Sequence, residues 1–418
     1  MRKLQILLLL FALSPTPYAL AQEYGWQDIS DNIPDFPYDT VYNNSGDTIV
    51  ALLTDVYFIN DNEGWITTWH PRNDSAAVLH TTDGGETFEV QITQFPCNAI
   101  HILNENEGYA GGKSGRVYHT TNGGDNWIAI GSIGTTLLDI SFPFDAGPNN
   151  PIGYASGDNG TVYSITPQGV LNLNSQLVIT LGGISAPSDS NVWVCGGNRI
   201  YYYNGTDFTS QFAPTGTFND IHFINNQEGW VVGNGGIIGY TTDGGANWDT
   251  QANPDNQNRS LYGVFFLDAN NGWAVSNGGL ILHTTNGGTN WLIEGEGLST
   301  AFLNGVHFTS PTNGYVVGNE KTLLKYTEVS GVGESEPMQF KIYPNPARKK
   351  FGVRSLEFVV NSGTLEIYDL NGRKLIEEQI PKGSETIEID VSSLESGVYF
   401  CRLISENKSS TQKLIIQK

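Results

Sequence analysis

Three aspartates could do chemistry together, because they occupy equivalent positions in a repeated pattern, each just before a short apolar segment. They are Asp55, Asp139 and Asp220. Carboxyl groups gathered at one site could bind a cation, and a pair of them could serve as the acid and base of a glycoside hydrolase. An aspartate in such a position also commonly caps a turn, so the position alone leaves both interpretations open.

A second candidate is the stretch HTTDGGETF (80–88), which recurs as TTNGGDNW (120–127), TTDGGANW (241–248) and TTNGGTNW (284–291). A calcium loop needs several acidic ligands at alternate positions and a distal glutamate, whereas each copy has one Asp or Asn followed by glycines. We therefore expect no metal site, and predict a hairpin in which Asp or Asn caps the turn amides and glycine adopts a positive φ. The residues predicted to have this structural role are Asp83, Gly85, Asn122, Gly124, Asp243, Gly245, Asn286 and Gly288.

These stretches belong to a longer repeat, in which an apolar strand and a polar turn usually lead to Gly-Trp or Gly-Tyr. The repeat occurs seven times, and its aromatic residues stand at positions 65, 109, 154, 193, 230, 273 and 315. A second strand, a glycine-rich turn, a third strand and often the DGG hairpin follow. A period of roughly 40 residues with four strands per unit is typical of a β-propeller. The sequence therefore predicts an all-β fold with seven blades over residues 22–330.

The seventh unit ends at LLKYTEV (323–329) without a fourth strand. The segment EYGWQDI (23–29) reads like the missing strand, so we predict that residues 24–29 complete the last blade. Such a closure would hide the strand edges that an open sheet exposes.

The turns of a blade lie alternately on two opposite faces of a propeller. The DGG hairpins are expected on the face opposite the connections between blades. That other face is predicted to carry most of the few basic residues: Arg72, Lys113, Arg116, Arg199, Arg259 and Lys321. They could form a pocket for an anionic group, such as a uronic acid, a sulfate or a carboxylate of a partner, or they could be scattered ion pairs on an acidic surface.

Histidines give little support to metal catalysis. Six of the seven recur at two repeat positions, as expected for packing: His101, His222 and His307 at one, and His80, His119 and His283 at the other. His70 is left over. With Trp69 it lies in the loop TTWHPRNDSA (67–76), which is either an exposed ligand contact or a loop packed on itself. The sequence has no phosphate-binding loop or nucleophile elbow, and we expect no cofactor.

The N-terminus, MRKLQILLLLFALSPTPYALA (1–21), has the charged start, apolar core and small-residue end of a secretory signal peptide, and its apolar run is short for a membrane span. Residues 22–330 contain 31 Asp and Glu against seven Lys and Arg, which argues against nucleic acid or an anionic membrane as a partner. Residues 331–418 contain 12 of each, which indicates a second domain. The cysteines, Cys97, Cys195 and Cys401, have no metal or disulfide spacing and are expected in the core.

The units EGWVVGNGGIIGYTTDGGANW (228–248) and NGWAVSNGGLILHTTNGGTNW (271–291) resemble the photosystem II assembly/stability factor-like propellers, and their hairpins resemble the Asp-box, or bacterial neuraminidase repeat. The resemblance covers nearly all of residues 22–330. It implies a seven-bladed, non-enzymatic interaction scaffold. Sialidases share the Asp-box, but they need three arginines in one pocket, whereas arginines are few in this propeller.

The C-terminal segments FKIYPNPARKKFGV (340–353), LEIYDLNGRKL (365–375) and VSSLESGVYFCRLIS (391–405) resemble the type A C-terminal sorting domain of the type IX secretion system. The matching residues are Tyr343, Pro344, Asn345, Pro346, Asp369, Gly372, Gly397, Tyr399 and the final Lys418. Alternating apolar residues suggest a small Ig-like antiparallel β-sandwich over residues 340–418, after a linker at 331–339. The resemblance implies export by the type IX machinery across the outer membrane, to the cell surface or the medium.

We therefore predict an exported, non-catalytic binding scaffold with a glycan or protein ligand. The candidate ligand contacts are Trp69, His70, Arg72, Lys113, Arg116, Arg199 and Arg259. The alternative is a carbohydrate-active enzyme, a glycoside hydrolase or a sialidase-like protein, that uses Asp55, Asp139 or Asp220.

Overall fold

The computed structural model describes residues 24–35, 40–42, 48–70, 76–92, 96–144, 146, 151–173, 175–211, 214–328, 340–355, 363–369, 373–382, 386–405 and 408–418. Its described part divides into two compact units, the first up to Glu328 and the second from Phe340. The expected signal peptide (1–21) and linker (331–339) lie outside the described residues. Within those residues, we find no helix with the length and apolar character needed to cross a membrane.

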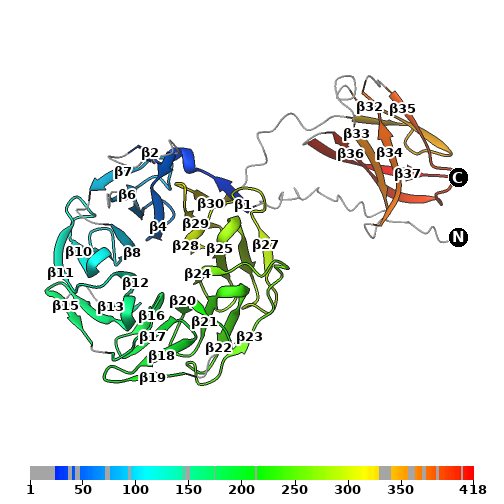
Figure 1. Cartoon of the computed structure of the whole chain (residues 1–418). Helices are drawn as coiled ribbons and strands as arrows, with labels where there is room; N and C mark the ends of the chain where they lie inside the picture. The colour runs from blue at the N-terminus through cyan, green and yellow to red at the C-terminus, as the bar shows by residue number, and fades with distance from the viewer. Residues whose placement is uncertain are drawn as a thin grey trace, which may run out of the picture. The chain divides into compact units, whose positions relative to one another are not determined.

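Seven four-stranded antiparallel sheets form a ring in the first unit (Figure 1). From inner to outer strand, the first three sheets are β4 (Leu52–Phe58), β5 (Gly64–Trp69), β6 (Ala77–Thr81), β7 (Glu89–Ile92); β8 (Cys97–Ile102), β9 (Gly108–Gly112), β10 (Arg116–Thr120), β11 (Ile128–Ser132); and β12 (Leu137–Ser141), β13 (Gly153–Gly157), β14 (Val162–Thr166), β15 (Gly169–Asn172). The next three are β16 (Gly183–Ser188), β17 (Asn191–Gly196), β18 (Arg199–Tyr203), β19 (Phe208–Ser210); β20 (Phe218–Phe223), β21 (Gly229–Gly233), β22 (Ile238–Thr241), β23 (Asp249–Thr250); and β24 (Leu261–Phe266), β25 (Gly272–Ser276), β26 (Ile281–Thr284), β27 (Leu292–Glu294).

The seventh sheet takes strands from both ends of the unit. Its strands are β28 (Leu303–Ser310), β29 (Asn313–Gly318), β30 (Leu323–Glu328) and β1 (Tyr24–Asp28). β1 pairs antiparallel with β30, with Trp26 opposite Tyr326. Each inner strand contacts the inner strands of both neighbouring sheets, β28 and β4 included, so the sheets close around an axis. This is the all-β, seven-bladed architecture that the repeat period predicts.

Short elements complete the described part of the first unit. A hairpin of β2 (Thr40–Tyr42) and β3 (Thr48–Val50) precedes the first sheet along the chain. The helical elements among the described residues are single 3-10 turns: η1 (Ser30–Asn32), η2 (Lys113–Gly115), η3 (Asp158–Gly160), η4 (Asn234–Gly236) and η5 (Asn277–Gly279).

The Gly-Trp pair of the repeat has a physical reason in the packing between blades. Trp230 of the fifth sheet stacks on Phe266 of the sixth, with ring centroids 3.5 Å apart. The other side of Phe266 lies against Gly272, where an added Cβ would come within 2.3 Å of the ring. The phenylalanine is therefore held between the glycine of its own blade and the aromatic residue of the preceding one. Trp193 on Phe223 and Trp273 on Phe308 repeat the stacking, at 3.9 and 3.5 Å.

The second unit contains two antiparallel sheets. One has three strands, β31 (Phe340–Tyr343), β32 (Lys350–Ser355) and β35 (Thr386–Asp390), and the other has four, β34 (Lys374–Ile380), β33 (Gly363–Tyr368), β36 (Gly397–Ser405) and β37 (Lys408–Ile416). Both sheets contribute to one buried apolar cluster, for example Phe351 and Ile389 from the first and Leu365 and Leu403 from the second. All three cysteines of the chain are buried free thiols, as expected from their spacing.

Candidate functional site

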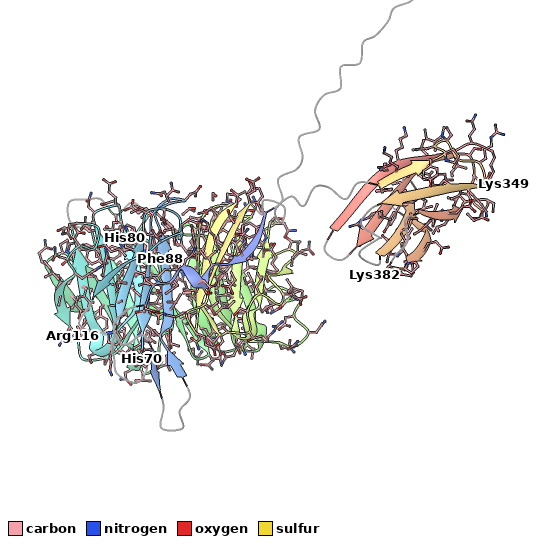
Figure 2. All side chains as sticks on the ribbon, turned by 90° about the horizontal axis from the view of Figure 1, so that it is seen from above. His70, His80, Phe88, Arg116, Lys349 and Lys382 are labelled. Atoms are coloured by element: carbon pink, nitrogen blue, oxygen red, sulfur yellow. The ribbon has the colours of Figure 1, made fainter. Side chains whose placement is uncertain are left out.

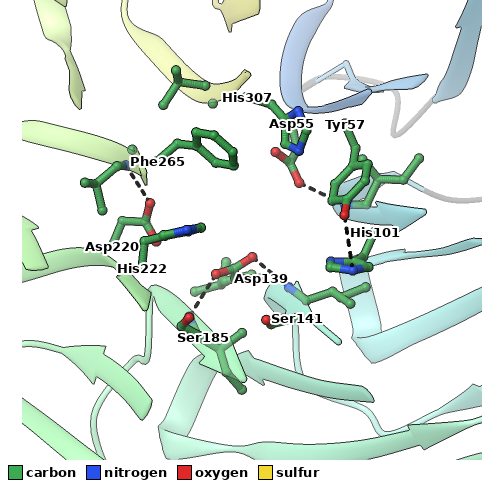
Figure 3. A pocket seen from close by; sticks show the side chains of 18 of the residues that line it. Asp55, Tyr57, His101, Asp139, Ser141, Ser185, Asp220, His222, Phe265 and His307 are labelled. Atoms are coloured by element: carbon green, nitrogen blue, oxygen red, sulfur yellow. Dashed lines mark hydrogen bonds between the residues drawn. The ribbon is translucent and has the colours of Figure 1, made fainter. Parts of the chain in front are cut away.

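A cavity of about 250 Å³ lies where the seven inner strands meet (Figure 3). The first level of its wall includes Asp55, Asp139 and Asp220. The second level consists of residues two places from that position along each inner strand: Tyr57, His101, Ser141, Ser185, His222, Phe265 and His307. We call these seven residues the collar. The structure therefore brings the three sequence-predicted aspartates together at one site.

β-bulges in six of the inner strands shape the first level. They fall next to Asp55, Ala99, Asp139, Asp220, Gly263 and Gly305. A bulge inserts one extra residue and re-aims side chains, so two consecutive residues, such as Thr54 and Asp55, both line the cavity. The sequence placed the aspartates before the inner strands. That position was wrong, because the bulged residues still pair and lie inside β4, β12 and β20.

Each of the three aspartates joins two inner strands. Asp55 accepts a hydrogen bond through Oδ1 from the backbone N of Val56 at 2.8 Å, and through Oδ2 from the backbone N of Ile100 in the next sheet at 2.9 Å. The other two aspartates make the same pair of bonds at 2.7 and 2.8 Å: Asp139 with Ile140 and Ile184, and Asp220 with Ile221 and Val264. The carboxyl groups thus fasten the first sheet to the second, the third to the fourth and the fifth to the sixth.

Neutral polar side chains fasten three further joints between sheets. Asn98 Nδ2 donates to the carbonyl O of Leu137 and Asn304 Nδ2 to that of Leu53, both at 2.8 Å. Ser185 Oγ accepts from the backbone N of Phe223 at 2.9 Å. The polar wall of the cavity is therefore part of the ring's own hydrogen bonding.

Burial controls the protonation of the carboxyl groups. It raises the pKa of Asp55 to about 7, although the backbone hydrogen bonds from Ile100 and Val56 oppose the shift. It also raises the pKa of Asp220 to about 7. Burial and the charges of Asp220 and Asp55 raise the pKa of Asp139 well above its usual range. Because like charges around one cavity disfavour ionisation, these groups keep their protons to a higher pH than surface carboxyls do.

The three histidines of the collar are neutral aromatic rings in this environment. Burial lowers the pKa of His101 and His307 to about 3 and that of His222 to about 4. The sequence assigned them to packing, and they do contact neighbouring aromatic rings, but they do so on the cavity wall. Among the residues that the structure describes, no group of three or more His, Cys, Asp or Glu side chains is arranged to hold a metal ion.

The basic candidates do not line this cavity where the structure describes them, and Arg72 lies outside the described residues. Arg259 is held by Asp255, which accepts from its Nε at 3.2 Å and from its Nη2 at 3.1 Å. Lys321 pairs with Asp35 at 3.4 Å. Arg199 is exposed, and Lys113 and Arg116 are half-buried. A shared basic pocket was expected on the propeller face, and it stays a prediction.

Trp69 is the last residue of β5, and His70 follows it. His70 is fully buried and Trp69 is half-buried. Residues 71–75 of the loop lie outside the described residues, so the ligand-contact role of Trp69 and His70 stays a prediction. Figure 2 shows His70 and Arg116 toward one face of the propeller, and His80 and Phe88, beside the first DGG hairpin, toward the opposite face.

The Asp-boxes are closed hydrogen-bonded turns. Thr81 Oγ1 donates to Asp83 Oδ1 at 2.8 Å and accepts from the backbone N of Gly85 at 2.9 Å, while Thr87 donates through its backbone N and its hydroxyl to the Asp83 carboxylate at 2.9 and 2.6 Å. Gly85 has a φ of 87°. The bonds from Thr87 lower the pKa of Asp83 to about 2. The other three copies repeat the two bonds of the threonine hydroxyl and the bond from the backbone N four residues after the Asp or Asn, around Asn122, Asp243 and Asn286.

The Asp-boxes also join neighbouring blades, which sequence reasoning missed. Trp65 Nε1 of the first sheet donates to the carbonyl O of Gly123 in the second sheet's hairpin at 3.1 Å. Trp193 does the same to Gly244 at 3.1 Å. Trp273 of the sixth sheet precedes a sheet without a DGG hairpin, and its Nε1 is buried with no hydrogen-bond partner among the described residues. The signal was the order of the elements, because the aromatic residue of one repeat is followed by the hairpin of the next repeat.

Two of the sorting-signal candidates, Asn345 and Lys418, make hydrogen bonds that hold the C-terminal end of the second unit in place. Asn345 Nδ2 donates to the carbonyl O of Lys413 at 2.7 Å, and its Oδ1 accepts from the backbone N of Ile415 at 2.8 Å. Lys418 Nζ donates to the carbonyl O of Ser392 at 2.7 Å. The other described candidates lie in or beside strands, namely Tyr343, Pro344, Pro346, Asp369, Gly397 and Tyr399. Gly372 lies outside the described residues.

Each unit is similar to a known family. The family described as photosynthesis system II assembly factor YCF48 matches residues 47–137 and 206–294. The family described as secretion system C-terminal sorting domain matches residues 341–417. A relative from Arabidopsis thaliana, the chloroplastic photosystem II stability/assembly factor HCF136, is 24% identical over 231 residues, which are 48% of this chain and 56% of that protein. The chain thus matches little more than half the length of this relative.

Solved structures share the propeller fold. YCF48 bound to a D1 peptide aligns with a TM-score of 0.55 at 19% identity, over 71% of this chain and 96% of that one. Virginiamycin B lyase from Staphylococcus aureus aligns with a TM-score of 0.57 at 15% identity, over 73% of this chain and 99% of that one. One protein is named for a bound peptide and the other for a lyase activity, so the fold alone does not decide between binding and catalysis.

Proposed function

We propose that this chain, which joins a photosystem II assembly factor-like propeller to a type IX secretion sorting domain, is an exported scaffold that binds a partner without catalysis. The observation that carries the proposal is the use of the three axial carboxyl groups. Each holds two backbone amides of neighbouring inner strands. A glycosidase needs one carboxyl group free to give its proton to the substrate and a second free to act as base or nucleophile. Carboxyl groups that carry the ring's own hydrogen bonds suit a structural role.

The sorting domain supports export. It implies passage across the outer membrane, and the propeller is the part that would act at the cell surface or in the medium. We further propose that the second unit is an Ig-like sandwich of residues 340–418, that residues 331–339 link it to the propeller, and that residues 1–21 are removed as a signal peptide. The two-sheet arrangement around one apolar cluster supports the first point. Arg116 and Arg199 are proposed as secondary contacts for a partner on the propeller face.

Export is tested by comparing the full chain with a version that lacks residues 341–417, in a bacterium that has the type IX machinery. We expect the full chain either in the medium or on the cell surface, where protease added to intact cells digests it. The truncated chain should stay inside the cells and remain intact. Equal behaviour of the two chains would contradict the exported location.

The absence of catalysis is tested on the purified full chain with a panel of aryl glycosides and sialosides between pH 5 and pH 8. We expect no turnover. Hydrolysis that disappears in Asp220→Asn and persists in Asp249→Asn, an exposed aspartate of β23, would establish the enzymatic alternative instead.

A further inference from the structure

We propose that the axial cavity binds a cationic side chain, lysine or arginine, presented by a protein partner. This inference rests on the proposed function of the propeller as a binding scaffold, and it names the chemistry of the partner. It concerns the wall of the cavity, where aromatic rings, carboxyl groups and amide oxygens meet (Figure 3).

The collar presents a continuous belt of aromatic rings on five of the seven inner strands. Tyr57 lies between His101 and His307, with ring centroids 4.6 and 4.4 Å away. His307 continues to Phe265 at 4.7 Å, and Phe265 to His222 at 5.0 Å. Because the histidines are neutral, the belt carries no positive charge of its own. Aromatic faces attract ammonium and guanidinium groups, and they do so more strongly where water is excluded.

The polar groups of the wall offer acceptors to a guest. Each oxygen of an axial carboxyl group accepts one hydrogen bond from a backbone amide. Because a carboxylate has about four acceptor positions, about two remain for a guest. Asn98, Asn219 and Asn304 each donate their amide NH₂ to a backbone carbonyl of the next sheet, so their own oxygens remain as acceptors. A lysine or arginine head group has donors and no acceptors. It therefore matches the wall, whereas a carboxylate or phosphate would meet acceptors and negative charge.

Charge and size point the same way. No Lys or Arg lines the cavity among the described residues. A positive guest relieves the mutual repulsion that raises the pKa of Asp139, and a neutral sugar does not. The volume of about 250 Å³ is below the usual range of pockets for whole small molecules. A single side chain that enters from a partner's surface fits this volume, and the acidic excess of the propeller would attract such a basic partner.

Binding should strengthen as the pH rises through 7, because the cation favours ionised carboxyl groups. The other titratable groups that face the aspartates are Tyr57, His101, Cys195, His222, Tyr262 and His307. The three histidines titrate near 3 to 4, and burial raises the pKa of Tyr57 to about 12 and that of Cys195 well above its usual range. The pH dependence between 5.5 and 8 therefore reports on the aspartates.

The test titrates the purified full chain with an acetylated and amidated pentapeptide that has one lysine among glycines and serines, and with a matched peptide that has norleucine in its place. At pH 8 we expect the lysine peptide to bind at least about tenfold more tightly than the norleucine peptide. At pH 5.5 we expect it to bind about tenfold more weakly than at pH 8. Equal binding of the two peptides, or binding of neutral glycans in competition with the lysine peptide, would overturn the proposal.

Two variants and their controls locate the site. Phe265→Leu removes a ring of the collar, and Asp220→Asn removes a carboxylate. Each variant should bind the lysine peptide about three- to tenfold more weakly than the unchanged chain does. Phe208→Leu and Asp249→Asn make the same changes on outer strands and should leave binding unchanged. An arginine peptide of the same design completes the test. Should neither the lysine nor the arginine peptide bind while the full chain is exported and shows no hydrolysis, this inference fails and the proposed function stands.

Discussion

The axial cavity and the Asp-boxes use the same residue in two opposite ways. In both places an aspartate accepts backbone hydrogen bonds that hold the propeller together. At the surface, the bonds from Thr87 lower the pKa of Asp83 to about 2. At the axis, burial raises the pKa of Asp55 to about 7 in spite of two amide donors. Similar hydrogen bonding therefore gives a permanent anion in one place and a proton-sensitive group in the other, because exposure to water differs.

This difference explains why the axial aspartates are the stronger functional candidates. An exposed carboxylate with satisfied partners has little to gain from a ligand. Carboxyl groups that repel one another in a cavity gain from any cation that enters. The Asp-boxes, in contrast, serve as joints between blades through their glycine carbonyls.

The largest expected effect comes from removing an axial carboxyl group that links two inner strands. Asp220→Ala leaves the backbone amides of Ile221 and Val264 without their acceptor. We expect a loss of about 2 to 4 kcal/mol in the free energy of unfolding, since each unpaired buried donor costs about 1 to 3 kcal/mol. Denaturant unfolding at pH 6 measures it, and a loss below that of Asp83→Ala would contradict the comparison.

The next effect is the pH dependence of stability. The axial carboxyl groups have raised pKa values in the folded chain, so the stability they contribute is full below the unfolded pKa of about 4 and is lost as the pH rises through about 7. We expect the first unit to lose about 2 to 3 kcal/mol for each of Asp55 and Asp220 between pH 5 and pH 8, since a pKa difference of one between the folded and unfolded chain corresponds to about 1.4 kcal/mol.

Thermal melts of the full chain at both pH values give the measurement. The double variant Asp55→Asn with Asp220→Asn should flatten the dependence, and Asp249→Asn should not change it. A propeller that is equally stable at both pH values would mean that the axial groups ionise as freely as surface groups do.

A smaller effect is expected in an Asp-box. Asp83→Ala removes the acceptor of the Thr87 amide and hydroxyl at an exposed turn. The change resembles the loss of a helix cap, which costs about 1 kcal/mol. Denaturant unfolding should show this loss, with unchanged dependence on pH between 5 and 8. Reduced binding of the lysine peptide by this variant, at unchanged stability, would place the ligand on the wrong face.

The smallest expected effect is a difference in stability between two Trp→Phe variants at buried positions. Trp193 and Trp273 both stack on a phenylalanine of the next blade, but only Trp193 donates its Nε1 to an Asp-box carbonyl. Trp→Phe at each position removes similar packing. We expect Trp193→Phe to cost about 1 kcal/mol more than Trp273→Phe, the value of one hydrogen bond. Equal losses in denaturant unfolding would show that the joint to the Asp-box contributes nothing.

The repeat period could predict the seven sheets because most blades satisfy the same packing rule, in which a phenylalanine lies between a glycine of its own blade and a Trp or Tyr of the preceding one. It could also align the three aspartates, since alternate strand positions are fixed by the period. It could not reveal that His101, His222 and His307 face the axis, because a repeated histidine looks the same in a core and on a cavity wall. The bulges beside Asp55 and its equivalents leave no mark in the sequence, yet they decide which side chains line the cavity.

The basic residues show a second limit. Their place in or beside turns could be read from the repeat, but the pairing of Arg259 with Asp255 depends on the conformation of one connection. Of the two sites that the sequence suggested, the axis is the one where strand geometry places acceptors and aromatic rings together.

The most direct test of the contrast is a titration of aspartate side-chain carboxyl carbons by NMR on the full chain, with Asp55→Asn, Asp220→Asn and Asp83→Asn for assignment. The structure predicts a pKa of about 7 for Asp55 and Asp220 and of about 2 for Asp83. Addition of the lysine peptide should lower the pKa values of Asp55 and Asp220 and leave the pKa of Asp83 unchanged. Axial aspartates that titrate in the ordinary range near 4, with or without the peptide, would contradict the account.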